Sequence, residues 1–146
     1  MFYMPSLQWI ALPQNFFTDH RGWSFAPFKN LEPIQKAQVD WDSFHAVSLE
    51  PGTVRGNHYH TETTEWLFFC GGPVRLVWRE AGSLTTREVL IENNYTLVII
   101  PPGISHAVKN ESPVTTYLIA FRSPVVSGEN PDVIRSELIR QTTPVA

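Results

Sequence analysis

Short β-branched and aromatic runs, each stopped by proline or glycine, constrain the fold of this chain more than any other feature. The 146 residues include 12 prolines and 8 glycines, and the longest apolar runs extend over only four or five residues. Residues 97–100 form one such run, which Pro101, Pro102 and Gly103 end sharply. Helical periodicity is scarce. This pattern predicts an all-β sandwich or barrel.

We expect one domain over residues 1–146, with a core barrel at about 40–123. Residues 1–12 would form a peripheral N-terminal arm with a strand at 6–12, and residues 30–38 a proline-interrupted loop. A short helix, capped by Asn130, Pro131 and Asp132, would run through Leu138. The strands expected in the core are 44–49, 66–69, 74–78, 86–91, 97–100 and 114–121.

Composition excludes several classes of partner. The net charge is −3, only 17% of residues are charged, and no basic cluster occurs. This argues against a nucleic acid or an anionic membrane as the partner. The single cysteine, Cys70, excludes an intrachain disulfide and fits a reducing compartment. We find no signal peptide and no run long enough to span a membrane, so we expect a cytoplasmic protein.

Two histidines two residues apart stand at the centre of the chain. In a strand, positions i and i+2 share a face, so the imidazoles of His58 and His60 would converge. Glu65 has the wrong parity for a continuous strand, but a polar turn at 61–64 would return it to the same face. Two imidazoles and a carboxylate on one wall begin a site for a first-row metal.

A third histidine would complete this site. His106 follows the break at Gly103 by three residues, and Asn110 comes four residues later. Three nitrogens and one oxygen would bind one divalent transition metal without selecting sharply among zinc, iron, manganese and nickel.

The spacing of these residues resembles the two cupin motifs. The first motif is matched by Gly52, His58, His60, Glu65 and Gly72. The gaps between these residues are five, one, four and six residues long, as in that motif. The second motif is matched by Pro101, Gly103, His106 and Asn110, with gaps of one, two and three residues. The family's second motif opens with a glycine, and Tyr95 stands at that position here. Asn93 and Asn94 would make the turn in its place. The resemblance implies a double-stranded β-helix, or jelly-roll barrel.

Two further segments resemble the RmlC-like branch of the cupins, the dTDP-4-keto-sugar epimerases. Asp19, His20, Arg21 and Gly22 are similar to its N-terminal turn, and Ala26 takes the place of the glutamate that follows it. Arg21 would either contact a phosphate or anchor the turn. The string from Arg55 to His60 is similar to the family's Arg-Gly-x-His-Tyr-Gln. This implies that Arg55 binds phosphate and that His58 acts as a base.

The same string looks closer still to the cupin domain of the CapF-type capsular polysaccharide enzymes. In that domain the second histidine, a glutamate and a later histidine bind a metal, which corresponds here to His60, Glu65 and His106. Without a metal, His58 or His60 would serve as the catalytic base.

These resemblances favour a nucleotide-activated keto-sugar in surface-polysaccharide synthesis as the ligand. The epimerases carry a tyrosine after the second motif that acts as the catalytic acid. Tyr117 is the only tyrosine in that part of this chain, and it lacks the family's flanking pattern. This argues against a full epimerase. We expect Tyr117 and His45 to contact the ligand. Two alternatives stay open: a metal-dependent dioxygenase or isomerase of a non-sugar metabolite, and a non-catalytic ligand-binding cupin.

Alternation within 66–69 favours a homodimer. Leu67 and Phe69 would join Glu65 inside the barrel, while Trp66 and Phe68 would face outward. Two outward aromatic side chains need cover from another sheet or subunit.

Overall fold

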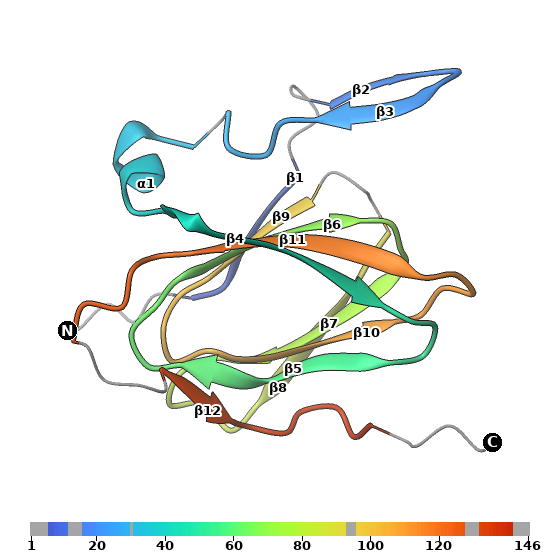
Figure 1. The fold of residues 1–146 in the computed structure, drawn as a ribbon. Coiled ribbons are helices and arrows are strands. Elements are labelled where there is room, and N and C mark those ends of the chain that lie inside the picture. Colours follow the sequence, from blue (N-terminus) through green and yellow to red (C-terminus); the bar gives the residue numbers. More distant parts are fainter. Residues whose placement is uncertain (1–5, 12–15, 30, 93–95, 128–131, 142–146) are drawn as a thin grey trace.

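Two five-stranded antiparallel sheets face each other in the computed structural model of the chain (Figure 1). The structure describes residues 6–11, 16–29, 31–92, 96–127 and 132–141. The elements are β1 (Gln8–Ala11), β2 (Phe16–Asp19), β3 (Gly22–Phe25), α1 (Pro33–Ala37), β4 (Asp40–Leu49), β5 (Val54–His60), β6 (Glu65–Cys70), β7 (Val74–Arg79), β8 (Thr86–Ile91), β9 (Thr96–Ile100), β10 (Ser105–Asn110), β11 (Thr116–Arg122) and β12 (Val133–Arg135).

The strand order is β1-β9-β6-β11-β4 in the first sheet and β12-β5-β10-β7-β8 in the second. Neighbours in each sheet are mostly distant in sequence, as in a jelly roll. Strands β2 and β3 form a separate hairpin that projects beyond the barrel (Figure 1). The all-β jelly-roll class predicted from the sequence is therefore confirmed. None of the described helices is of a length and apolarity that would allow it to cross a membrane.

The main core fills the space between the two sheets. Leu67 and Phe69 of β6 and Leu118 of β11 point into it, where they meet Leu76 and Val108 of the opposite sheet. These side chains alternate with outward-facing ones, which is the period-two pattern that the sequence showed.

A second core cluster covers part of the outer face of the first sheet. Trp66 is only 2% exposed, and it packs in this cluster with Leu31 and Val39, which flank α1. Phe68 packs against the same cluster. Trp66 and Phe68 do face away from the barrel interior, but the chain itself covers Trp66. The homodimer expected from this face stays a prediction, and Trp66 does not need a second subunit to cover it.

Three local expectations need correction or fall outside the described residues. The loop expected at 30–38 contains the helix α1, which starts at Pro33 with a capping box between Glu32 and Gln35. The helix expected from Asp132 to Leu138 is wrong, because 133–135 pair with β5 as strand β12. The turn at Asn93 and Asn94 and the cap at Asn130 and Pro131 lie outside the described residues.

An extra residue in β5 sets the orientation of the site. His58 lies opposite His106 and Gly56 lies opposite Ala107, so Asn57 has no counterpart on β10. Gly56 and Asn57 both have positive φ, at 89° and 56°, and together they form a β-bulge. Positions three apart normally face opposite sides of a strand. Because of the bulge, Arg55 and His58 both face the barrel interior.

We expect Gly56→Ala to destabilise the fold more than Gly52→Ala. Both glycines have positive φ, which costs an alanine about 1–2 kcal/mol. A Cβ at Gly56 would also lie 2.8 Å from the backbone oxygen of His106, whereas one at Gly52 would meet nothing within 4 Å. Overpacking of this kind costs a further ~1–3 kcal/mol. Urea unfolding of the two variants measures the difference, and equal losses would contradict the close approach of β5 and β10.

Candidate functional site

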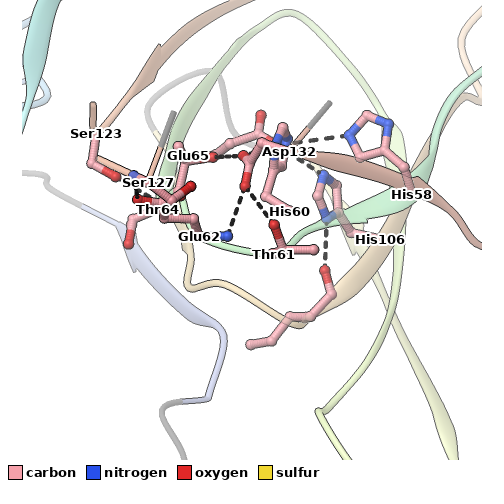
Figure 2. Close-up of polar contacts among 12 residues, drawn as sticks. His58, His60, Thr61, Glu62, Thr64, Glu65, His106, Ser123, Ser127 and Asp132 are labelled. Carbon is pink, nitrogen blue, oxygen red and sulfur yellow. Dashed lines mark hydrogen bonds and ion pairs between the residues drawn. The ribbon is translucent and has the colours of Figure 1, made fainter. Parts of the chain in front are cut away.

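Three imidazoles converge on one buried carboxylate inside the barrel (Figure 2). Glu65 stands at the start of β6 in the first sheet, while His58 and His60 on β5 and His106 on β10 belong to the second. The Nε2 atoms of His58 and His106 lie 3.7 Å and 3.3 Å from Glu65 Oε1, and Nε2 of His60 contacts the same oxygen. The polar turn at 61–64 returns Glu65 to this face, as expected.

The environment keeps Glu65 ionised. Burial raises the pKa of its carboxyl, but the imidazoles of His106, His58 and His60 lower it by more, so that the pKa lies well below the ordinary value. The side chain of Glu65 is only 9% exposed. Even so, Oε1 has no hydrogen bond of good geometry among the described residues. A buried anion of this kind requires positive charge beside it.

Hydrogen bonds at Nδ1 of His60 and His106 determine whether the Nε2 atom of each ring carries a proton or a lone pair. Nδ1 of His106 lies 3.0 Å from the carbonyl oxygen of Ile104, and Nδ1 of His60 lies 2.9 Å from Oδ2 of Asp132. A carbonyl and a carboxylate only accept, so both Nδ1 atoms must donate. The neutral rings then present lone pairs to Glu65 Oε1. Acceptors that face each other in this way need a cation between them or an extra proton on each ring.

The surroundings of His60 favour an extra proton on its ring. Burial lowers the pKa of His60, but Glu65 and Asp132 raise it by more, so the net shift is upward. Burial likewise raises the pKa of Asp132, but bonds from Thr63 and His60 lower it by more, to about 2. The alternative to extra protons is a metal ion.

The donor set fits a metal ion. The ligand atoms of His58, Glu65 and His106 all lie within 4.8 Å of one another, and His60 contacts the same carboxylate oxygen. Ligands about 2.1 Å from one ion would lie about 3.0–3.4 Å apart. The distances from Glu65 Oε1 to His106 and His58, 3.3 Å and 3.7 Å, are close to this range. Imidazole and carboxylate suit zinc and other first-row metals.

A pocket of about 190 Å³ opens onto this cluster. Its polar inner end is formed by His58, Glu65 and His106, and Arg55 and His45 also line it. Nε of Arg55 donates to the carbonyl of Ser48 at 2.8 Å. Apolar side chains from both sheets form the rest of the wall: Val47, Leu67, Val108, Leu118 and Ala120.

The structure does not bring every expected residue to this pocket. His60 lies behind it and is buried, whereas His58 lines it. Tyr117 is 53% exposed and is not among the lining residues, because its neighbour Leu118 takes the inward position on β11. Arg21 stands in the turn of the β2–β3 hairpin, where its guanidinium pairs with Asp19 at 2.6 Å. Of its two expected roles, the structure shows the anchoring of the turn.

Asp132 is a site residue that the sequence did not reveal. It lies 72 residues after His60, yet its carboxylate accepts a hydrogen bond from the His60 ring. No spacing rule connects two such distant positions. The sequence pattern predicted that Asp132 caps a helix, and it contains no signal for the contact with His60.

One protein family matches most of the chain. The family described as polysaccharide biosynthesis C-terminal domain matches residues 18–134. No curated protein sequence matches the chain.

Solved structures resemble the chain at low identity. CapF, the capsular polysaccharide assembling protein of Staphylococcus aureus, is 21% identical over 65% of this chain, with a TM-score of 0.58. The chain spans only 28% of the length of that protein. A 3,4-ketoisomerase from Helicobacter canadensis is 17% identical over 92% of both chains, with a TM-score of 0.68.

A third solved structure is the dTDP-6-deoxy-D-glucose-3,5-epimerase RmlC of Legionella pneumophila, in complex with dTDP-4-keto-L-rhamnose. It is 19% identical over 82% of this chain and 68% of its own, with a TM-score of 0.64. All three share the barrel described above. The chain thus has the jelly-roll fold of these three proteins, and it belongs to the polysaccharide biosynthesis C-terminal domain family.

Proposed function

We propose that this cupin binds one divalent transition metal and catalyses isomerase- or epimerase-like carbonyl chemistry on a nucleotide-activated keto-sugar in surface-polysaccharide synthesis. One observation carries the proposal. A buried, ionised carboxylate faces the lone pairs of two imidazoles at the inner end of a pocket. A cation relieves that repulsion and at the same time gives the pocket a group that can act on a carbonyl.

The metal would be held by His58, His60, Glu65 and His106. The rings of His60 and His106 are fixed through Nδ1, so their Nε2 atoms are oriented toward Glu65. His58 differs from them, because no hydrogen bond within the described part of the chain fixes its ring through Nδ1, and its side chain is 27% exposed. It is therefore the member of the set that a substrate could displace.

The pocket has room for a sugar ring but not for a whole nucleotide sugar. Its volume of about 190 Å³ lies below the ~300–1,000 Å³ that drug-sized ligands occupy. The sugar would enter the barrel and pack against the apolar wall, while the diphosphate stays outside. Arg55 lines the same pocket and would bind the phosphates.

Removal of a proton beside a carbonyl leaves negative charge on oxygen. The bound metal would polarise the carbonyl and stabilise that charge. His58, once displaced, would take the proton and return it at the neighbouring carbon. His45, on the opposite sheet, lines the same pocket and would contact the sugar from the other side.

The comparisons support this proposal through proteins of the same fold. The Legionella epimerase was solved with a dTDP-4-keto sugar, and the Helicobacter protein is a 3,4-ketoisomerase. The description of the matching family, polysaccharide biosynthesis C-terminal domain, supports a role in polysaccharide synthesis.

Metal analysis tests the ligand set. We expect about one equivalent of metal in protein purified without chelator or nickel resin, and its loss in the double variant His60→Ala/His106→Ala. His45→Ala, which changes a pocket residue outside the convergence on Glu65, should retain the metal. Elemental analysis by mass spectrometry gives the answer. A metal-free wild-type protein, or metal retained in the double variant, would refute the proposed site.

Arg55→Ala should weaken the binding of dTDP- and UDP-sugars by roughly 10- to 100-fold, because charge-assisted hydrogen bonds contribute about 1.5–3 kcal/mol each. Arg75→Ala is the matched control, since Arg75 is paired with Glu111 and Glu88 and does not line the pocket. Calorimetric titration measures both. If no nucleotide sugar binds the wild-type protein, the sugar assignment fails; oxygen uptake with iron(II) would then favour a dioxygenase.

His58→Asn separates metal binding from proton transfer. We expect the variant to keep its metal on the three remaining ligands. Deuterium exchange from solvent into a bound dTDP-4-keto-6-deoxy sugar should fall by at least ~100-fold, because the proton carrier is gone. NMR of the sugar follows this exchange. Undiminished exchange in a metal-loaded His58→Asn variant would exclude His58 as the base.

A further inference from the structure

Ser123, Ser127 and Asp132, which follow β11, form hydrogen bonds with the turn between two proposed metal ligands (Figure 2). The turn is 61–64, between His60 and Glu65. At one side, the backbone N–H of Thr64 donates to the hydroxyl of Ser123 at 2.9 Å, and Ser123 N–H donates back to the Thr64 carbonyl at 3.0 Å. At the other side, Thr61 N–H donates to the carbonyl of Asp132 at 2.9 Å.

The carboxylate of Asp132 accepts hydrogen bonds from three of the four residues of that turn. It accepts hydrogen bonds from the hydroxyl of Thr63 at 2.6 Å, the hydroxyl of Thr61 at 2.9 Å and the backbone N–H of Glu62 at 2.7 Å. Its fourth donor is Nδ1 of His60 at 2.9 Å. Asp132 is only 7% exposed, so these four donors take the place of solvent.

The bond to His60 differs in kind from the other three. The hydroxyl and backbone donors hold the turn in place, whereas the ring donor also fixes a tautomer. An imidazole that donates from Nδ1 keeps its lone pair on Nε2, and Nε2 is the atom that contacts Glu65. A carboxylate behind a ligating histidine orients the ring and raises its basicity.

We propose that Asp132 is a positioning residue that holds His60 in the Nδ1–H tautomer and aims its Nε2 at the metal position. This inference rests on the proposed function, because it assigns Asp132 a role toward the same metal. It makes the proposed metal ligands depend on residues that follow strand β11. The turn-holding bonds alone would give Asp132 a merely structural role, and the two roles predict different results.

The test compares Asp132→Asn with Glu62→Gln. Glu62 is also bonded to residues that follow β11, since its carboxylate accepts the backbone N–H groups of Val126 and Ser127 at 2.6 and 2.8 Å, but it makes no contact with the His60 ring. Both substitutions remove one charge with little change in shape. Zinc affinity is measured by competition with a chelator, and the His60 tautomer by ¹⁵N NMR of metal-free protein at a pH where the rings are neutral.

We expect Asp132→Asn to bind zinc about 10- to 100-fold more weakly and to move the His60 nitrogen shifts away from the Nδ1–H tautomer. Glu62→Gln should change neither by more than about twofold. Equal losses of affinity in the two variants with an unchanged His60 tautomer would overturn the proposal. A wild-type protein that binds no zinc, but whose His60 tautomer changes in Asp132→Asn, would refute the metal site and leave the positioning role standing.

The wild-type protein supplies a second measurement in case Asp132→Asn does not fold. The ring N–H at Nδ1 of His60 should give a proton signal that exchanges slowly with solvent, because it is buried and hydrogen-bonded. His60→Gln should remove that signal and identify it. A wild-type spectrum in which His60 carries its proton on Nε2 would overturn the proposal without any Asp132 variant.

Discussion

The rest of the site depends on one buried negative charge that three histidines surround. Glu65 stays ionised although its side chain is buried, and its Oε1 has no well-aligned hydrogen bond within the described residues. A lone carboxylate in such a place would be neutralised or would destabilise the fold. The neighbouring groups are arranged around this charge. Hydrogen bonds at Nδ1 orient the rings of His60 and His106 toward Glu65, and Glu65 also lines the pocket.

The local parts of this arrangement could be predicted from the sequence because they depend on spacing. His58 and His60 are two residues apart on one strand, and a short polar turn returns Glu65 to their face. Period-two alternation likewise predicted the inward positions of Leu67 and Phe69. What the sequence could not supply is pairing over long distances. Asp132 reaches His60 across 72 residues, and no local pattern records such a contact.

Three sequence-based expectations differ from the structure for separate physical reasons. Tyr117 was expected at the ligand because it is the only tyrosine after the second motif, but strand parity gives the inward position to Leu118. Trp66 was expected to need cover from another sheet or subunit, and residues that flank α1, Leu31 and Val39, supply that cover. Asp132 was expected at the cap of a short helix that would run through Leu138, yet residues 133–135 pair with the edge of β5 as strand β12.

Glu65 belongs to one sheet of the barrel, and the three histidines belong to the other. Any cation shared by these residues would therefore link two layers that otherwise meet mainly through apolar packing, with a few hydrogen bonds such as the one from Arg55 to the carbonyl of Ser48. Apolar packing resists separation of the layers but has little direction, so the layers could still shear past each other. Bonds with fixed geometry at one end of the sandwich would resist shear as well, and would couple the stiffness of the whole barrel to the occupancy of a single position.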